Sequence, residues 1–196
     1  MPTILEQLSM EMAGLADQVL PSLVQIGDGR QNIGAGTIWH SEGLILTNAH
    51  VVDHSSLNVT LTDGQEFSAR LIARDPQYDL AALVVDANNL PAIEPGSSKA
   101  LEAGQLVMAL GHPFGVIGAA SAGVVIGVGS EWQEDPFSGR DWVMVSLNLR
   151  PGNSGGPLVD TRGRIVGINT IMNGPEVGVA IPVDVAKHFL HQSLTV

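Results

Sequence analysis

The feature that most constrains this sequence is a succession of short apolar runs, which begins at Ser22 and continues almost to the C-terminus. Glycine, proline, Asp-Gly and Asn-Asn interrupt the runs, and these residues favour turns between strands. Six runs precede a segment rich in Pro and Gly at 87–104, and six follow it. The pattern predicts an all-β fold of two six-stranded antiparallel β-barrels. The expected strands are 22–26, 33–39, 43–47, 57–62, 65–73, 80–85, 105–110, 120–129, 142–148, 157–160, 163–170 and 177–181.

A helix is expected at each end of the chain. Thr3 and Glu6 fit a capping box, and Pro21 ends the first helix, which we expect to pack on the body of the protein in preference to a docking or oligomerisation role. Its apolar residues recur at helical spacing: Ile4, Leu8, Met12, Leu15 and Val19. The second helix should begin at Pro182 and run to about Gln192. We expect one domain, divided into an N-terminal helix (1–21), a first barrel (22–90), a crossing segment (91–104), a second barrel (105–181) and a C-terminal helix (182–196).

The nonapeptide at 150–158, Arg-Pro-Gly-Asn-Ser-Gly-Gly-Pro-Leu, places three glycines and two prolines around one serine. Its backbone must turn repeatedly, so Ser154 should be presented at the surface of a turn. The N–H groups of Gly152 and Ser154 could then stabilise an oxygen that becomes negative during attack by the serine. A plain Gly/Pro turn with an incidental serine is the alternative. A phosphate-binding loop is disfavoured, because the stretch lacks the lysine of that motif.

A serine nucleophile needs a base and a carboxylate, and the sequence offers both. His50 follows the apolar run Leu-Ile-Leu, and Asp79 stands at the start of another apolar strand. Asp75 is a weaker candidate because it precedes a proline in a turn, and Asp86 is weaker because it ends its strand. The sequence therefore predicts that His50 and Asp79 meet Ser154 in the cleft between the two barrels.

Three motifs in the order His, Asp, Ser carry a family resemblance. They are Leu-Thr-Asn-Ala-His-Val-Val at 46–52, Tyr-Asp-Leu-Ala at 78–81 and Gly-Asn-Ser-Gly-Gly-Pro-Leu at 152–158. The order resembles chymotrypsin-like serine proteases, since other triad folds use other chain orders. The sequences of these motifs are similar to those of the bacterial HtrA/Deg branch, and the resemblance covers about residues 22–192.

The resemblance implies a serine endopeptidase that acts on unfolded or misfolded protein and needs no cofactor. It assigns His50, Asp79 and Ser154 to the catalytic triad, and Gly152, Asn153 and Ser154 to the oxyanion hole. It places the substrate pocket at Leu149, Arg150, Ile168, Asn169, Thr170, Ile171 and Val177. Ile168, Ile171, Val177 and Val179 would make the pocket apolar, and no Asp lies in 146–152. We therefore expect cleavage after small or medium aliphatic residues.

The chain departs from the family pattern at the pocket. The family usually has Asp-Ala-Ala-Ile-Asn before Pro-Gly-Asn-Ser, whereas this chain has Leu-Asn-Leu-Arg at 147–150 after Ser146. This altered loop leaves open a second hypothesis, a chaperone-like module that keeps the protease fold and binds unfolded polypeptide with weak cleavage. No PDZ domain is expected after Val196 unless the chain was cut, and the N-terminal segment lacks the aromatic residues through which family trimers commonly interlock. A homo-oligomer is left open, without a decision on a trimer.

Composition excludes several partners. A formal charge of −11 argues against nucleic acid and against an anionic membrane surface, because both bind basic patches. The chain has no cysteine and no apolar run long enough to span a membrane. The N-terminus lacks a signal-peptide pattern, so the sequence as written indicates the cytoplasm, and a trimmed chain would indicate the periplasm or cell envelope.

The remaining histidines are expected to be structural. His188 and His191 are three residues apart on the last helix, but without a third ligand they indicate a solvated face, and no metal is expected. His54 should be a loop residue. His112 lies where the family usually has Gly-Asn-Pro-Phe-Gly, so a role in a turn is favoured over catalysis.

Overall fold

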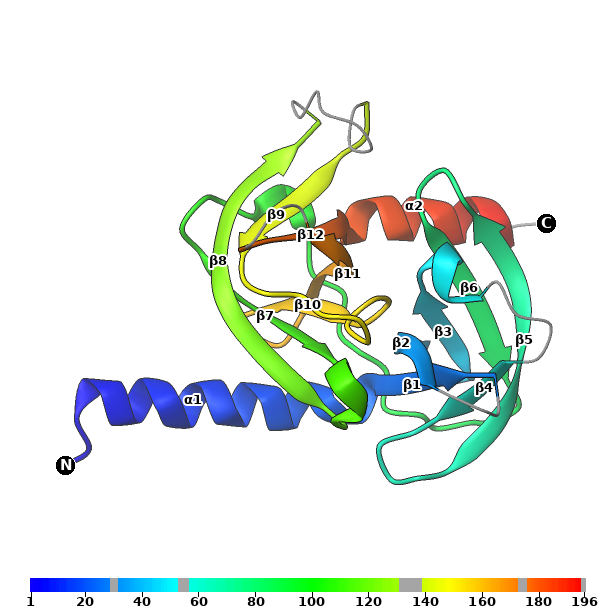
Figure 1. Cartoon of the computed structure of the whole chain (residues 1–196), viewed down its shortest axis with the longest axis horizontal. Coiled ribbons are helices and arrows are strands. Elements are labelled where there is room, and N and C mark those ends of the chain that lie inside the picture. The colour runs from blue at the N-terminus through cyan, green and yellow to red at the C-terminus, as the bar shows by residue number, and fades with distance from the viewer. Residues whose placement is uncertain (29–31, 53–56, 131–138, 173–175, 195–196) are drawn as a thin grey trace.

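In this computed structural model, two β-barrels lie side by side and a long N-terminal helix extends from one end (Figure 1). The described residues are 1–28, 32–52, 57–130, 139–172 and 176–194. The predicted fold class is therefore confirmed. No end of an observed strand differs from its predicted position by more than two residues.

The first barrel is closed and antiparallel, in the order β1-β2-β3-β6-β5-β4, with β4 pairing back onto β1. Its strands are β1 (Leu23–Gly27), β2 (Asn32–His40), β3 (Leu44–Thr47), β4 (Leu57–Thr60), β5 (Glu66–Asp75) and β6 (Leu80–Val85). Buried apolar residues alternate along β4, as expected of a strand with one face toward the barrel interior. This barrel carries His50 and Asp79.

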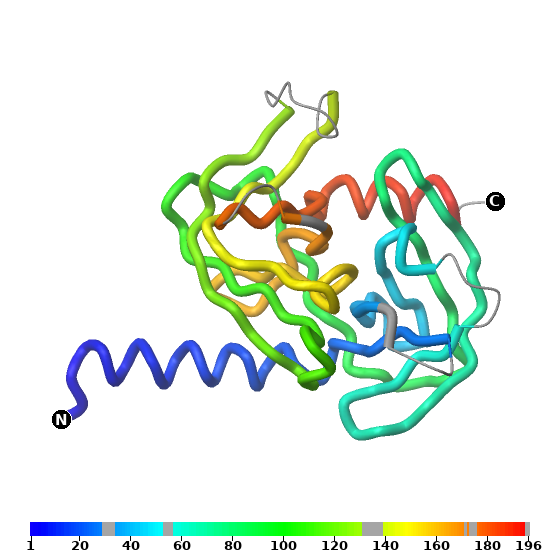
Figure 2. The backbone as a smooth tube through the Cα atoms, viewed as in Figure 1, coloured from blue at the N-terminus to red at the C-terminus, as the bar shows by residue number. Residues whose placement is uncertain are grey.

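The second barrel closes in the order β10-β11-β12-β9-β8-β7, with β7 pairing onto β10. Its strands are β7 (Leu106–Gly111), β8 (Ala119–Gly129), β9 (Trp142–Ser146), β10 (Pro157–Asp160), β11 (Ile165–Met172) and β12 (Val177–Pro182). The backbone trace shows the loop from β9 to β10, which carries Ser154, turned toward the first barrel (Figure 2).

Two α-helices flank the barrels. Helix α1 (Ile4–Val19) has the predicted capping box, in which the Glu6 N–H donates to Thr3 Oγ1 at 3.2 Å and the Thr3 N–H donates to Glu6 Oε2 at 2.7 Å. Only Leu15 and Val19 of this helix are buried, so the expectation that it packs along the body is wrong for most of its length. Helix α2 (Val183–Leu194) packs against the second barrel through its buried side. Short 3₁₀ turns are η1 (Leu20–Ser22), η2 (Ala49–Val52), η3 (Ser98–Ala100) and η4 (Pro113–Gly115).

The two barrels are joined by a shared apolar core and by direct backbone contacts. Leu46 of the first barrel and Ile168 of the second belong to the same buried cluster. Across the barrel interface, the Ala35 N–H donates to the carbonyl oxygen of Ser154 at 2.8 Å, and Thr37 Oγ1 donates to the carbonyl oxygen of Gly155 at 3.3 Å. Strand β2 of the first barrel therefore fixes the position of the serine-bearing turn of the second.

Candidate active site

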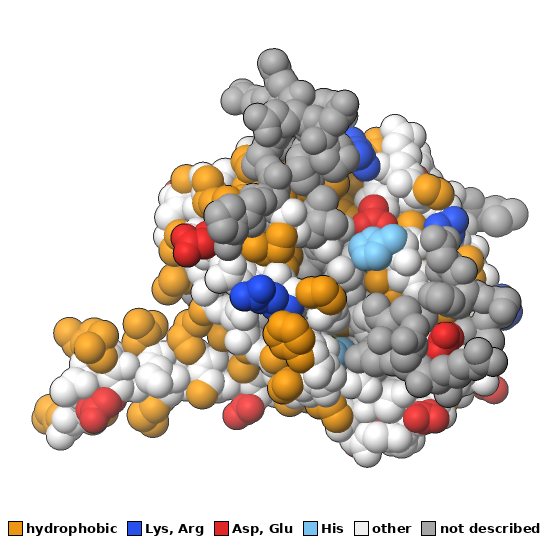
Figure 3. Space-filling model, in the orientation of Figure 1, with side chains coloured by type: hydrophobic (Ala, Val, Ile, Leu, Met, Phe, Trp, Pro, Cys, Tyr) orange, Lys and Arg blue, Asp and Glu red, His pale blue; other side chains and the backbone are white. Residues whose placement is uncertain are grey.

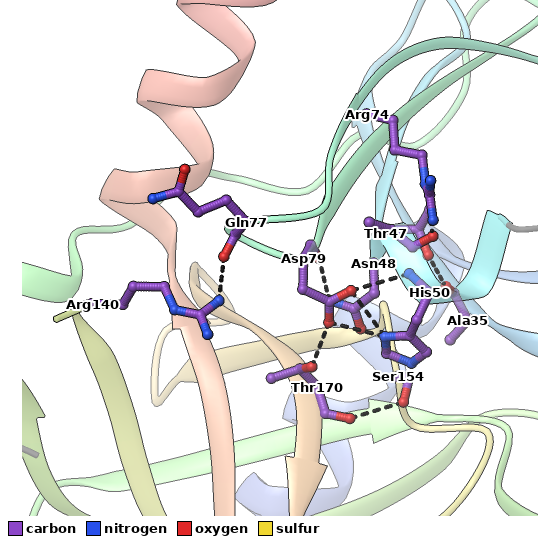
Figure 4. Close-up of polar contacts among 11 residues, drawn as sticks. Ala35, Thr47, Asn48, His50, Arg74, Gln77, Asp79, Arg140, Ser154 and Thr170 are labelled. Atoms are coloured by element: carbon purple, nitrogen blue, oxygen red, sulfur yellow. Dashed lines mark hydrogen bonds and ion pairs between the residues drawn. The ribbon is translucent and has the colours of Figure 1, made fainter. Parts of the chain in front are cut away.

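His50 lies on η2, the 3₁₀ turn that directly follows β3. Its backbone N–H donates to Asp79 Oδ1 at 3.0 Å, and its ring Nδ1 lies 2.9 Å from Asp79 Oδ2 (Figure 4). The His50 side chain is 47% exposed, so part of the imidazole is open to solvent. The contact through Nδ1 leaves Nε2 free to accept a proton, which is the arrangement that a histidine base requires.

Asp79 occupies the turn before β6, in the left-handed backbone region with φ 54. Asn48 Nδ2 donates to its carbonyl oxygen at 3.0 Å, and Thr170 Oγ1 donates to its Oδ2 at 2.7 Å. Burial raises the pKa of the Asp79 carboxyl, but hydrogen bonds from His50 and Thr170 outweigh burial and hold the pKa below its usual value. Asp79 is therefore kept as a carboxylate that can orient His50.

Ser154 follows a tight turn whose first hydrogen bond runs from the Asn153 N–H to the carbonyl oxygen of Arg150 at 2.9 Å. Pro151 at the second position and Gly152 with φ +101 at the third fit a type II turn. Within the described part of the chain, no hydrogen bond uses the N–H of Gly152 or of Ser154. Both donors are thus available to an oxyanion, whereas the Asn153 N–H is taken up by the Arg150 carbonyl oxygen, and the assignment of an oxyanion hole stays a prediction.

The turn is held from two sides. Asn153 is buried, and its Oδ1 accepts from the Arg150 N–H at 3.0 Å, which closes the turn internally. Outside the turn, the His112 N–H donates to the carbonyl oxygen of Gly152 at 2.8 Å. A Cβ at Gly152 would lie 2.4 Å from the His112 carbonyl oxygen, so the close approach requires glycine.

The Ser154 hydroxyl donates to the carbonyl oxygen of Thr170 at 2.9 Å. Figure 4 shows the His50 ring beside the same hydroxyl. Thr170 therefore touches two members of the predicted triad, Asp79 through its side chain and Ser154 through its backbone. The sequence predicts a pocket position for Thr170 but not this contact, because nothing in the local pattern around Thr170 indicates a partner 91 residues away.

The other residues predicted for the pocket lie in different settings. Leu149, Ile168 and Asn169 are buried, Val177 is half-buried and Arg150 is exposed. Asn169 Nδ2 donates to the carbonyl oxygens of Leu110 and Pro157, so this side chain ties strands of the second barrel together. The side chain of Ile171 lies outside the described residues. The assignment of these residues to a substrate pocket stays a prediction.

His112 is buried, with 2% exposure, behind the turn at 150–153, which we call the oxyanion turn. Burial lowers the pKa of His112 to about 4, and the nearby Val24 backbone offsets this only in part. Its Nδ1 accepts from the Gly118 N–H at 3.2 Å. His112 is a neutral structural residue of the turn that supports Gly152.

Other site types find no support in the described residues. Across the ranges that the structure describes, no group of three or more His, Cys, Asp or Glu side chains is placed to hold a metal ion. Within the same ranges, no helix is both long and apolar enough to cross a bilayer. His54 lies outside the described residues.

Comparison with known proteins agrees with the geometry. Residues 34–168 match the family model described as a trypsin-like peptidase domain. The chain is 35% identical over 98% of its length to a probable periplasmic serine endoprotease DegP-like of Halomonas elongata, and it covers 41% of that protein. It is 40% identical over 80% of its length to the protein of the same name in Pseudomonas putida, and it covers 34% of that relative. The chain thus spans less than half the length of these curated relatives.

Solved structures give the same result. The HtrA-type protease AlgW with tripeptide superimposes with a TM-score of 0.85 at 33% identity, over 93% of this chain and 62% of the other. The same protease with decapeptide gives a TM-score of 0.85 at 28% identity, over 93% of this chain and 67% of the other. The family match covers well over half of the described fold, including His50 and Ser154. The chain therefore belongs to the family of trypsin-like peptidase domains, and within that family it is similar to HtrA/DegP-type proteases.

Proposed function

We propose that the chain is a single protease domain, a serine endopeptidase that hydrolyses peptide bonds in unfolded or misfolded polypeptides. The observation that carries the proposal is the contact of His50 with Asp79, together with Thr170, which bonds the Asp79 carboxylate through its side chain and the Ser154 hydroxyl through its backbone. Relatives named as serine endoproteases, and peptide-bound HtrA-type structures, support the same reaction.

Hydrolysis follows from the geometry in two steps. When substrate binds, the Ser154 hydroxyl exchanges the Thr170 carbonyl for His50 Nε2 and attacks the scissile carbonyl carbon as His50 takes its proton. The tetrahedral oxyanion accepts hydrogen bonds from the N–H groups of Gly152 and Ser154. His50 then protonates the leaving amine, and a water molecule hydrolyses the acyl-enzyme by the same route. Asp79 holds the imidazole tautomer and stabilises its cation throughout, and no step uses a cofactor.

Covalent labelling tests the proposal. A fluorophosphonate probe should react with the wild-type chain, and peptide mapping should find the adduct on Ser154, because only an activated serine reacts quickly with such a probe. Ser121→Ala, a change to a half-buried serine on β8, is the matched control and should label at the parent rate. Tight binding of unfolded polypeptide by a chain that does not label would support the chaperone-like alternative instead.

The proposal includes a preference for the type of residue on the acyl side of the cleaved bond. The loop before Ser154 is bound to β11 by the Leu149 N–H, which donates to Met172 Sδ at 2.9 Å, and Met172 packs against the apolar cluster that includes Leu149. These walls are apolar, so we propose cleavage after small or medium aliphatic residues. A peptide-library digest with faster cleavage after Lys or Arg would contradict this preference.

Helix α1 supports a proposal about assembly. Ile4, Leu5 and Met10 are 83%, 76% and 68% exposed, and the helix extends away from the barrels (Figure 1). Exposed apolar area of this kind is characteristic of an interface. We propose that α1 contributes to a homo-oligomer, with no commitment to a trimer. Light scattering should show a smaller particle after Leu5→Glu, and an unchanged mass would refute the role.

The relatives' names favour a periplasmic location over the cytoplasm.

A further inference from the structure

An exposed apolar patch lies on the segment between β7 and β8. Phe114, Val116 and Ile117 are 81%, 57% and 62% exposed, and they define what we call the 114–117 patch. The two other described phenylalanines, Phe67 and Phe189, pack against apolar clusters. A large aromatic side chain that stays exposed contributes little to the stability of the fold. Three exposed apolar residues close together therefore indicate a binding surface.

The backbone of the patch is fixed in an unfavourable conformation. Phe114 has φ 56, a backbone conformation that residues other than glycine rarely adopt. The turn is held there by the Gly115 N–H, which donates to the His112 carbonyl oxygen at 3.2 Å, and by the Val116 N–H, which donates to Pro113 at 3.0 Å. Such strain persists only where the surrounding structure imposes it, and it is concentrated at functional sites. The patch is thus a defined surface with its phenylalanine turned outward.

The patch adjoins the oxyanion turn. The His112 N–H bonds the Gly152 carbonyl oxygen at 2.8 Å, and a Cβ at Gly152 would lie 3.1 Å from Pro113 Cα. Phe114 is the next residue in the chain. Figure 3 shows hydrophobic side chains gathered near the middle of a face that also presents an exposed histidine. A substrate carbonyl held by the Gly152 N–H therefore lies close to this patch.

Chain direction decides which part of the substrate reaches the patch. The proposed acyl-side walls belong to β11 and the loop before Ser154, and Thr170 at the end of this region touches the Ser154 hydroxyl. In Figure 1, β11 and the start of β8 lie on opposite sides of the loop that joins β9 to β10. In an extended substrate, the acyl segment and the leaving-group segment run in opposite directions from the scissile carbonyl. The leaving-group segment therefore runs toward the 114–117 patch.

We propose that Phe114, Val116 and Ile117 form a subsite for an apolar side chain of the substrate, in the residues just C-terminal to the scissile bond. This inference rests on the proposed protease function. The occupant is apolar because the patch carries no charged or hydrogen-bonding side chain. It is the substrate itself because the patch is continuous with the turn that holds the scissile carbonyl. The protease would thus recognise the hydrophobic residues that unfolding exposes on both sides of the cleaved bond.

The test compares leaving groups on one acyl sequence. Three substrates share the same aliphatic acyl side and carry Phe-Ala, Gly-Gly or p-nitroaniline after the cleaved bond. The parent should show a kcat/KM about 10-fold higher for Phe-Ala than for Gly-Gly, as one apolar side chain in a pocket provides. Phe114→Ser should remove this ratio and leave the p-nitroanilide rate and the fluorophosphonate labelling rate unchanged. Val116→Ser should reduce the ratio as well.

Ile126→Ser is the matched control, because Ile126 is 45% exposed on β8 beyond the patch, and it should keep the parent ratio. A Phe-Ala to Gly-Gly ratio that is the same in Phe114→Ser and parent would refute the subsite. A smaller particle mass for Phe114→Ser in light scattering would show that a second copy covers the patch, and would also refute it. Failure of the parent to label would refute the protease function itself, and the subsite with it.

Discussion

Thr170 Oγ1 donates a hydrogen bond to Asp79 Oδ2 at 2.7 Å, while the carbonyl oxygen of the same threonine accepts the Ser154 hydroxyl at 2.9 Å. One residue of the second barrel therefore contacts the Asp79 carboxylate of the first barrel and Ser154, the candidate nucleophile, of its own. The contact links the two halves of the site across the barrel interface, and it makes the alignment of the site depend on β11.

Thr170→Val should remove the donor to Asp79 and keep the size of the side chain. Hydrogen bonds to charged groups contribute about 1.5–3 kcal/mol, so kcat should fall at least about 10-fold. The pKa of the Asp79 carboxyl should rise, because one of the groups that lowers it is gone. Kinetics and NMR titration of the carboxyl check both effects. Thr161→Val serves as the control, because Thr161 is exposed in the turn after β10. An unchanged kcat in Thr170→Val would show that His50 alone aligns Asp79.

Gly152→Ala should impair the oxyanion turn more than the fold. The new Cβ meets the His112 carbonyl oxygen and forces the turn to move, which should lower kcat by about 10²- to 10³-fold, as the loss of an oxyanion donor does. Gly64→Ala is a matched control, because Gly64 has a similar φ of +88 but open space around it. Gly64→Ala should reproduce the backbone strain and keep full activity. Equal activity of the two variants would refute the role of Gly152.

The burial of His112 predicts an acid-sensitive fold. Its pKa is about 4 in the folded chain against an ordinary 6.5, so between these values the unfolded state binds a proton that the folded state does not. Stability is therefore full above pH 6.5 and falls as pH decreases toward 4, by on the order of 3 kcal/mol from this residue. Urea unfolding at pH 7 and pH 4.5 should show a smaller loss in His112→Asn than in the parent. Parallel losses in both chains would exclude His112 as the cause.

The sequence predicts the barrels well because each strand carries its own signal. Alternating or continuous apolar runs bounded by Gly and Pro locate the ends of β1 to β12 to within two residues. His50, Asp79 and Ser154 could be selected as candidates because each stands in a distinctive local motif. The fold of the serine turn follows from Pro151 and Gly152, whose backbone preferences select its geometry.

Contacts between distant segments could not be predicted in this way. Thr170 reads as one more residue of a strand, and its bond to Asp79 arises only when the barrels pack together. The spacing of apolar residues in α1 correctly predicts a helix, but it does not show that Leu5 and its neighbours project from the body. Periodicity identifies an apolar face and leaves its partner undetermined. The exposure of Phe114 is a similar case, because it depends on how the segment after β7 wraps the Gly152 turn.

The non-additivity of the triad gives another prediction. His50→Ala should lose nearly as much activity as removal of the nucleophile, and Asp79→Asn should lose about 10⁴-fold because the wrong tautomer of His50 is favoured. His50→Ala combined with Ser154→Ala should be little worse than either alone, since residues that act as one unit are not additive. Steady-state kinetics of the four variants checks this. Multiplicative losses in the double variant would mean that the two residues act independently.

Ser154 is the proposed nucleophile, and casein hydrolysis by purified Ser154→Ala tests this role most directly. The Ser154 hydroxyl makes one hydrogen bond to a backbone carbonyl, so its removal should leave the thermal melting temperature nearly unchanged. Turnover should fall by about 10⁴- to 10⁶-fold. Degradation of casein by this variant at the parent rate, with contaminating protease excluded by an active-site label, would contradict the account.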